Sequence, residues 1–96
     1  MYDDIPIFMR EFLQYMLNIK NRSKNTVNEY YYDLRDSFKF LKLYKSGIKS
    51  KNITNDMIND TNILTLDINF VRKIDLNDLY EYLTFLSERA FWQSNN

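Results

Sequence analysis

Residues 23–45 read SKNTVNEYYYDLRDSFKFLKLYK, and apolar side chains recur along this stretch at steps of three and four. That spacing predicts one long amphipathic helix of about 22 residues, roughly 33 Å in length, because residues three and four apart share one face of an α-helix. Ser23 is the expected N-cap, since its side chain can accept a hydrogen bond from a first-turn N–H. The predicted buried face consists of Val27, Tyr30, Tyr31, Leu34, Phe38 and Leu41.

A second helix is predicted before this one, with Asp4 as its cap, Pro6 in its first turn and an end near Ile19. Proline is tolerated in the first turn because its missing N–H would have no helical partner there. Residues 21–23 then form a tight connection to the long helix. The expected buried stripe consists of Ile5, Phe8, Phe12, Met16 and Ile19, widened by Met9 and Leu13.

The chain after residue 45 is predicted to form a polar loop followed by a third long helix. Residues 46–69 are rich in Asn, Lys, Thr and Ser and hold the only Gly, so we expect at most a short helix near residues 55–59. A short apolar patch packs down around residues 68–71, and Asp75 then caps a helix that ends near Glu88. The expected buried face of this helix carries Leu76, Leu79, Tyr80, Leu83 and Leu86.

The composition indicates a single all-α domain over residues 1–89, with residues 90–96 as a tail or truncation point. A chain of 96 residues that is 45% hydrophobic can form one core, and its single Gly and single Pro leave few turn signals. No apolar run approaches the roughly 18 to 20 residues that span a bilayer, and no basic signal peptide opens the chain. We therefore expect a cytoplasmic protein with no membrane partner.

Cysteine and histidine are both absent from the chain. Their absence removes disulfides, thiol nucleophiles, thiolate and imidazole metal sites, and the commonest general acid/base at neutral pH. We therefore expect a segment that is not an enzyme by itself and that holds no cofactor and no metal.

The net charge of zero hides a gradient along the chain. Nine bases and three acids lie between Lys20 and Lys51, whereas three bases and seven acids follow from Asn52 onward. A basic stretch of this kind is typical of a surface that attracts a polyanion.

The polar side of residues 23–45 is the candidate binding surface. Its cations can neutralise phosphates, an Asn can read an adenine edge, and a helix fits the major groove of DNA. The N-terminus of the helix, near residues 23–26, also offers free N–H groups to a phosphate. The alternative is a solvated face on which Arg35 or Lys39 pairs with Asp36. The stripe is formed by Asn25, Asn28, Tyr32, Arg35, Lys39 and Lys42.

Two other groups of residues suggest chemistry but have simpler explanations. The run Tyr30-Tyr31-Tyr32 offers a phenol nucleophile, yet nothing nearby in the sequence supplies an activating base, so core and rim packing is favoured. Asp75, Asp78, Glu81 and Glu88 could suggest a metal site. The first two stabilise a helix N-terminus equally well, and the last two fit a solvated face.

The residues that carry a family resemblance cover nearly the whole chain. Residues 12–16 (FLQYM), a polar turn, residues 23–30 (SKNTVNEY) and then Asp33-Leu34, Phe38 and Phe40-Leu41 follow one order, and residues 68–83 (INFVRKIDLNDLYEYL) continue it. This order resembles the N-terminal core-binding domain of tyrosine recombinases and phage integrases, most similar to the Xer-like members.

The resemblance implies a SAM-like bundle of four helices that forms one jaw of a clamp around a recombination site. It also implies partners: double-stranded DNA, the catalytic domain of the same parent protein and other recombinase protomers. Together with the polar stripe, which adds Lys42, the contacts expected on DNA are Lys24, Asn25, Thr26, Asn28, Tyr32, Arg35, Lys39 and Lys42.

Three departures from the family pattern stand out. Family members often have Arg at the positions of Tyr31 and Tyr32, so the central contacts are less basic in this chain. The family's catalytic set of two Arg, a Lys, His residues and a Tyr nucleophile belongs to a following domain, and this chain cannot hold that set because it has no His. Its basic fourth helix would follow Glu88-Arg89, where this sequence stops within a few residues.

A protein-interaction module is the alternative function. Without a fourth helix, the apolar stripes of the first and third helices, together with Phe91 and Trp92, would form an exposed patch that favours a homodimer.

Overall fold

The computed structural model describes residues 2–95, with side chains up to Arg89. In chain order the elements are α1 (Ile7–Asn18), α2 (Lys24–Lys45), the short 3-10 helix η1 (Ser50–Asn52), α3 (Asn55–Asp60), α4 (Ile68–Arg72) and α5 (Leu76–Asn95). No strand occurs over residues 2–95, which confirms the all-α class.

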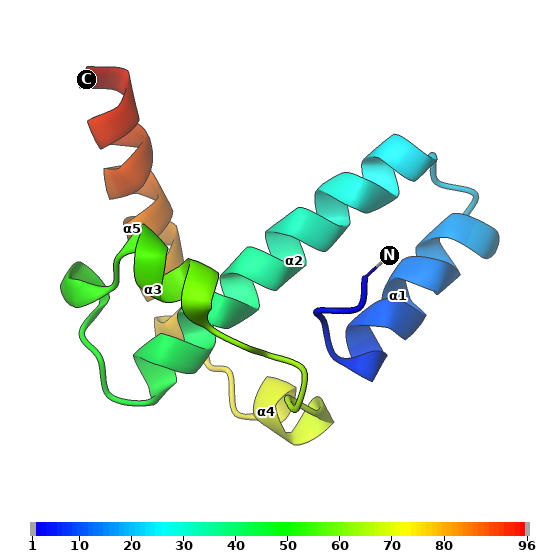
Figure 1. Ribbon diagram of the computed structural model, residues 1–96, viewed down its shortest axis with the longest axis horizontal. Helices are drawn as coiled ribbons and strands as arrows, with labels where there is room; N and C mark the ends of the chain where they lie inside the picture. Colours follow the sequence, from blue (N-terminus) through cyan, green and yellow to red (C-terminus); the bar gives the residue numbers. More distant parts are fainter. Residues whose placement is uncertain (1, 96) are drawn as a thin grey trace.

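Helix α2 is the long central helix, and its bounds confirm the sequence prediction (Figure 1). The Ser23 side chain accepts a hydrogen bond from the Thr26 N–H at 3.1 Å, so the predicted cap is also confirmed. The helix ends because Gly47 adopts a φ of +107°, a conformation that glycine enters without steric penalty. The Gly47 N–H then donates to the Tyr44 carbonyl at 3.1 Å.

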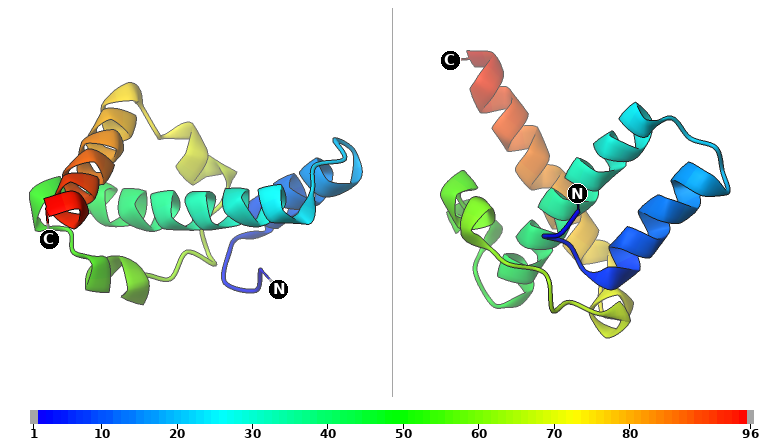
Figure 2. Two further views of the ribbon diagram at one scale, coloured as in Figure 1. Left: turned by 90° about the horizontal axis from the view of Figure 1, so that it is seen from above. Right: turned by 45° about the vertical axis from the view of Figure 1, so that its right-hand side comes forward.

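Separate core clusters form at the two ends of α2. Helix α1 lies along its N-terminal half, whereas α3 and α5 pack on its C-terminal half (Figures 1 and 2). The first cluster joins Ile5, Met9, Leu13 and Val27 to Ile63, and the second joins Phe40, Leu41, Ile53 and Ile58.

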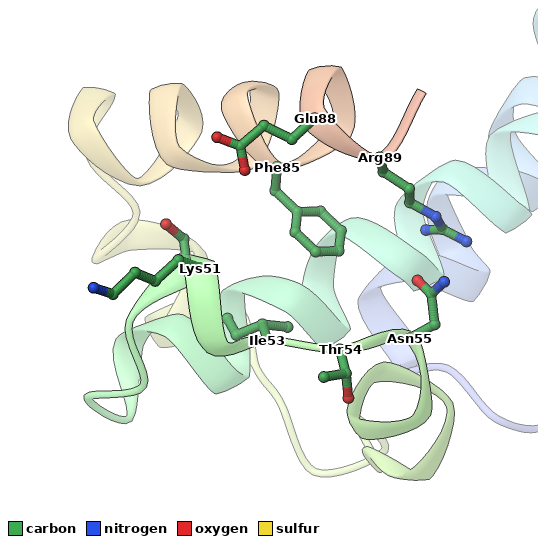
Figure 3. A pocket seen from close by; sticks show the side chains of 8 residues that line it. Lys51, Ile53, Thr54, Asn55, Phe85, Glu88 and Arg89 are labelled. Atoms are coloured by element: carbon green, nitrogen blue, oxygen red, sulfur yellow. The ribbon is translucent and has the colours of Figure 1, made fainter. Parts of the chain in front are cut away.

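Phe40 is the centre of the second cluster and is fully buried. Its ring lies 4.8 Å from the ring of Phe85, 5.3 Å from that of Tyr82 and 5.9 Å from that of Tyr44. Phe85 points from α5 toward Ile53 (Figure 3), which fixes α5 against η1 and the loop after it. The sequence prediction did not include Phe40 in the buried face of α2.

Helix α1 departs from the prediction at its start and in the face that it buries. Its N-cap is Pro6 and its first residue is Ile7, so Asp4 is not the cap. The buried positions are Met9 and Leu13, whereas Phe12 is 44% exposed and Ile19 is 66% exposed. The predicted positions Ile5, Met9 and Leu13 pack with Val27 in the first core cluster. The buried face is therefore confirmed on that side, and the prediction was wrong for Phe12 and Ile19.

The region from residue 46 to residue 69 matches the prediction of a loop with a short helix, which is α3. Helix α4 adds one turn where the apolar patch was expected, with the Asp67 carboxylate accepting from the Asn69 N–H at 2.9 Å. Ile63 of the loop is fully buried in the first core cluster, which the polar character of its neighbours did not predict.

Helix α5 shows the largest departure from the prediction. The predicted buried face is exposed, and the helix continues to Asn95 rather than ending near Glu88. Tyr82 and Phe85 face the second core cluster, and Asp78 is only 5% exposed. Aromatic packing on Phe40 and the hydrogen bonds of Asp78 hold the side with Tyr82 and Phe85 against the core. The side of α5 that carries the leucines therefore faces outward. The side chains of Phe91 and Trp92 lie outside the described part of the chain.

None of the described helices is long and apolar enough to cross a membrane.

Candidate nucleic-acid interface

The start of α2 presents the first group of predicted DNA contacts. Lys24 and Asn25 are exposed, and Thr26 is half-buried. The Ser23 hydroxyl donates to the Thr26 side-chain oxygen at 2.9 Å while Ser23 also caps the Thr26 N–H, so Thr26 belongs to the cap. The N–H groups of Lys24 and Asn25 have no intrahelical acceptor by helix geometry, so they are suited to an anion.

Arg35 lies in a cage of aromatic rings and carboxylates on the middle of α2. Its Nε donates to Asp36 Oδ1 at 3.1 Å, which confirms the local ion pair that the sequence left open. Its Nη1 donates to the Tyr31 hydroxyl at 3.4 Å and lies 3.8 Å from Asp4 Oδ2. The guanidinium carbon lies 5.3 Å and 5.1 Å from the ring centroids of Tyr31 and Tyr32. Arg35 is thus engaged within the protein and only 25% exposed.

The pKa shifts in this cage follow from its contacts. Burial raises the pKa of Tyr31, and the Asp4 carboxylate, which accepts a hydrogen bond from its hydroxyl at 2.6 Å, raises it further. Burial opposes the charged form of Arg35, but its bonds with Tyr31 and Asp36 keep the net pKa raised. A phenol with a raised pKa stays protonated at neutral pH, which is the opposite of what a nucleophile needs.

Asn28 and Tyr32 flank this cage. The Asn28 side-chain oxygen accepts a hydrogen bond from the Tyr2 hydroxyl at 2.5 Å. The Tyr2 ring lies 4.6 Å from the ring of Tyr31, and Tyr32 is 54% exposed. A surface hollow at this place is lined by residues of the chain start and of α2: Tyr2, Asp3, Asp4, Asn28, Tyr31, Tyr32 and Arg35.

The lysines of the C-terminal half differ in their engagement. Lys42 donates to the backbone carbonyl of Asn62, which ties it to the loop before α4. Lys39 is half-buried and makes no hydrogen bond or ion pair with any residue over the described range. Among the predicted cations of α2, Lys24 and Lys39 are therefore the ones that make neither an ion pair nor a side-chain hydrogen bond in the described chain, whereas Lys42 is held by a backbone carbonyl.

The contacts of Tyr2 and Asp4 with α2 were not predicted from the sequence. They join residues 26 and 27 positions apart, so no local spacing reveals them. The sequence signal for them was an acid ahead of the first helix, Asp4, which the sequence predicted as the helix cap.

Three of the four acidic residues at the start of α5 and along it make structural hydrogen bonds. Asp75 and Asp78 exchange hydrogen bonds between side chains and backbone N–H groups at 2.9 and 3.0 Å, which forms the N-terminal cap of α5. Glu81 accepts from the Ser50 hydroxyl at 2.7 Å. Glu88 borders a hollow of about 300 Å³ that Lys51 and Arg89 also line (Figure 3). No group of three or more acidic, His or Cys residues suited to a metal occurs over residues 2–95.

Comparison with known proteins agrees with the fold and with the order of motifs along it. A family described as phage integrase, N-terminal SAM-like domain matches residues 9–95, from the first turn of α1 to the last residue of α5. The chain belongs to this family. This membership identifies the chain as a recombinase-associated domain of the integrase SAM-like type. It also confirms the resemblance seen in the sequence.

The integrase SAM-like domain also has a curated relative. The tyrosine recombinase XerC of Caldanaerobacter subterraneus subsp. tengcongensis is 43% identical over 82 residues, which cover 85% of this chain and 22% of that protein. The chain thus spans about a fifth of the length of this relative. No solved structure matches the chain significantly.

Proposed function

We propose that this chain is the DNA-binding domain of a tyrosine recombinase and that the outer side of α2 contacts the DNA backbone. The observation that carries the proposal is the continuity of α2 from Lys24 to Lys45, with polar and cationic side chains on the side away from the core residues Val27 and Leu41. A straight helix with that pattern suits a groove of duplex DNA. The family membership and the similarity to a tyrosine recombinase support the same partner.

The proposed mechanism is positional rather than chemical. Lys24 and Lys39 supply cations that are not neutralised within the described protein, and the first-turn N–H groups supply donors for a phosphate. Asn25 and Tyr32 are exposed and add polar contacts to base edges or sugars. The domain holds the recombination site and positions a separate catalytic domain of the same parent protein, alongside other recombinase protomers. No bond is made or broken in this segment.

The test is a fluorescence anisotropy titration of the chain with a nonspecific duplex at several salt concentrations. Neutralising about four phosphates predicts a slope of log affinity against log salt of about −3 to −4. Binding that does not respond to salt, or no binding at low salt, would refute the proposed interface.

The exposed side of α5 favours a second candidate function, which is association with another protein surface. Large apolar side chains recur along it at helical steps and form the α5 stripe: Leu76, Leu79, Tyr80, Leu83 and Leu86. Leu76, Tyr80 and Leu83 are 62%, 60% and 59% exposed, and contiguous apolar patches of this kind mark interaction sites. We propose self-association through the α5 stripe, which is compatible with DNA binding through α2.

A further inference from the structure

The first residues of the chain cross the candidate DNA face of α2. We call residues Tyr2–Asp4 the N-terminal strap. Ile5 and Pro6, which follow it, are fully buried and anchor it to the first core cluster. The strap precedes the first helix and lies beside the N-terminal half of α2 (Figures 1 and 2).

The strap engages two of the residues expected to contact DNA. The Tyr2 hydroxyl donates to Asn28 at 2.5 Å, which occupies an amide oxygen that base reading would use. Asp4 Oδ2 lies 3.8 Å from Arg35 Nη1, and Asp4 Oδ1 accepts from Tyr31 at 2.6 Å. One short segment therefore covers both the candidate base-reading amide and the central guanidinium.

The Asp4 carboxylate faces Arg35 in the way that a DNA phosphate could. Both groups present anionic oxygens to a guanidinium, and a phosphate that approached Arg35 would meet the negative charge of Asp4 at short range. Asp36 binds the Nε of Arg35 from within α2. Asp4 is the second carboxylate near the guanidinium, on its Nη1 side, where the Tyr31 hydroxyl also accepts a hydrogen bond. DNA and Asp4 thus compete for one cation.

The contacts that hold the strap are suited to release. The Asp4 side chain is 48% exposed, so water and salt screen its interaction with Arg35. Tyr2 has a φ of +69°, in the left-handed region that side chains other than those of glycine and asparagine rarely adopt. If the strap left α2, Tyr2 could move out of that conformation, while Ile5 and Pro6 would stay packed.

We infer that the N-terminal strap is an autoinhibitory latch that must leave Asn28 and Arg35 before the α2 face binds DNA fully. The inference rests on the proposed DNA-binding function. It assigns to the first residues of the chain a regulatory role that depends on competition between a carboxylate and a phosphate.

The test compares two aspartate substitutions that make the same change in net charge. Asp4→Asn keeps an acceptor for Tyr31 but removes the charge that faces Arg35. Asp60→Asn, at the exposed end of α3, reports the general effect of one lost negative charge. We expect Asp4→Asn to tighten binding of a nonspecific duplex about twofold to fivefold more than Asp60→Asn does. In an Arg35→Ala background the two substitutions have equal effects.

A pair of variants without a change in charge tests the contact between the Tyr2 hydroxyl and Asn28. Tyr2→Phe removes the hydroxyl on Asn28 and is expected to tighten binding by up to about twofold, whereas Tyr15→Phe on α1 leaves it unchanged. Circular dichroism checks that every variant keeps its helices. In spectra of the ¹⁵N-labelled wild-type chain, the amides of residues 2–4 are expected to move toward random-coil positions when the duplex is added.

The outcomes separate the latch from the proposed function. If the wild-type chain binds DNA but Asp4→Asn tightens binding no more than Asp60→Asn, the latch is refuted and the DNA-binding function stands. Weaker binding by Asp4→Asn also refutes the latch, because Asp4 would then position Arg35 for DNA. If no variant binds DNA at any salt concentration, both proposals are refuted.

Discussion

Lys45 and Asp78 join the last turn of α2 to the first turn of α5, with Lys45 Nζ 2.7 Å from Asp78 Oδ2. Lys45 also donates to the Lys73 backbone carbonyl at 3.0 Å, and Asp78 accepts from the Asp75 N–H at 3.0 Å. Burial disfavours the ionised form of Asp78, but the bonds from Lys45 and Asp75 outweigh it and lower the pKa of Asp78. This ion pair, in which Asp78 is buried and Lys45 stays partly exposed, helps to fix which side of α5 faces the core.

The lowered pKa of Asp78 predicts a stability that depends on pH. The carboxylate titrates near its ordinary value in the unfolded chain and lower in the folded chain, so its contribution is complete above that ordinary value. The contribution is lost as the pH falls through the folded pKa. We expect Asp78→Asn to lower the free energy of unfolding by about 1 to 3 kcal/mol at pH 7, and by much less below about pH 3.

Urea denaturation of the wild-type chain and the variant at both pH values measures this difference. Asp60→Asn is the control for a lost charge at an exposed site. An equal loss of stability for Asp78→Asn at both pH values would contradict the assigned role of the pair.

Phe40 and Phe12 are predicted to differ sharply in their contribution to stability. Phe40 is fully buried among three rings, whereas Phe12 is 44% exposed. We expect Phe40→Leu to lower the free energy of unfolding by about 1 to 2 kcal/mol, because the smaller side chain leaves a cavity. Phe12→Leu is expected to change it by less than about 0.5 kcal/mol. Thermal unfolding followed by circular dichroism compares the stability of the two variants. Equal losses of stability would contradict the placement of Phe40 at the centre of the core.

Lys39 is predicted to contribute a phosphate contact. Since it has no intramolecular ion pair in the described chain, Lys39→Ala removes a cation that is open to DNA. We expect the slope of log affinity against log salt to become shallower by about 1. Lys51→Ala, at an exposed lysine in η1, is the matched control and leaves the slope unchanged. The same flattening for both variants would mean that the α2 face has no special role.

The α5 stripe predicts self-association that a single substitution disrupts. Leu83 is 59% exposed, so Leu83→Glu leaves the core intact but places a charge in the stripe. We expect light scattering to show dimers of the wild-type chain at high concentration and monomers of Leu83→Glu. Thr84→Glu adds the same charge at the next exposed position, outside the stripe, and is expected to leave the dimer in place. A monomeric wild-type chain at high concentration would contradict this proposal.

Local sequence was sufficient to predict the all-α class, the bounds and cap of α2, the short helix at residues 55–60 and the family. These features depend on neighbours within one or two turns, such as the Ser23 hydroxyl and the Thr26 N–H. A helix of 22 residues with a clear cap and a glycine just beyond its end leaves little for distant contacts to change.

The tertiary structure decided which faces of α1 and α5 are buried and which α2 cations are already engaged. Helix α5 carries apolar residues on two sides, so periodicity alone could not choose between Leu83 and Phe85. The choice came from Phe40 and Lys45, which lie more than 30 residues earlier in the chain. Asp4 and Arg35 likewise meet only because α1 folds back along α2. Contacts between residues so far apart have no signature in local spacing, because chain topology alone brings them together.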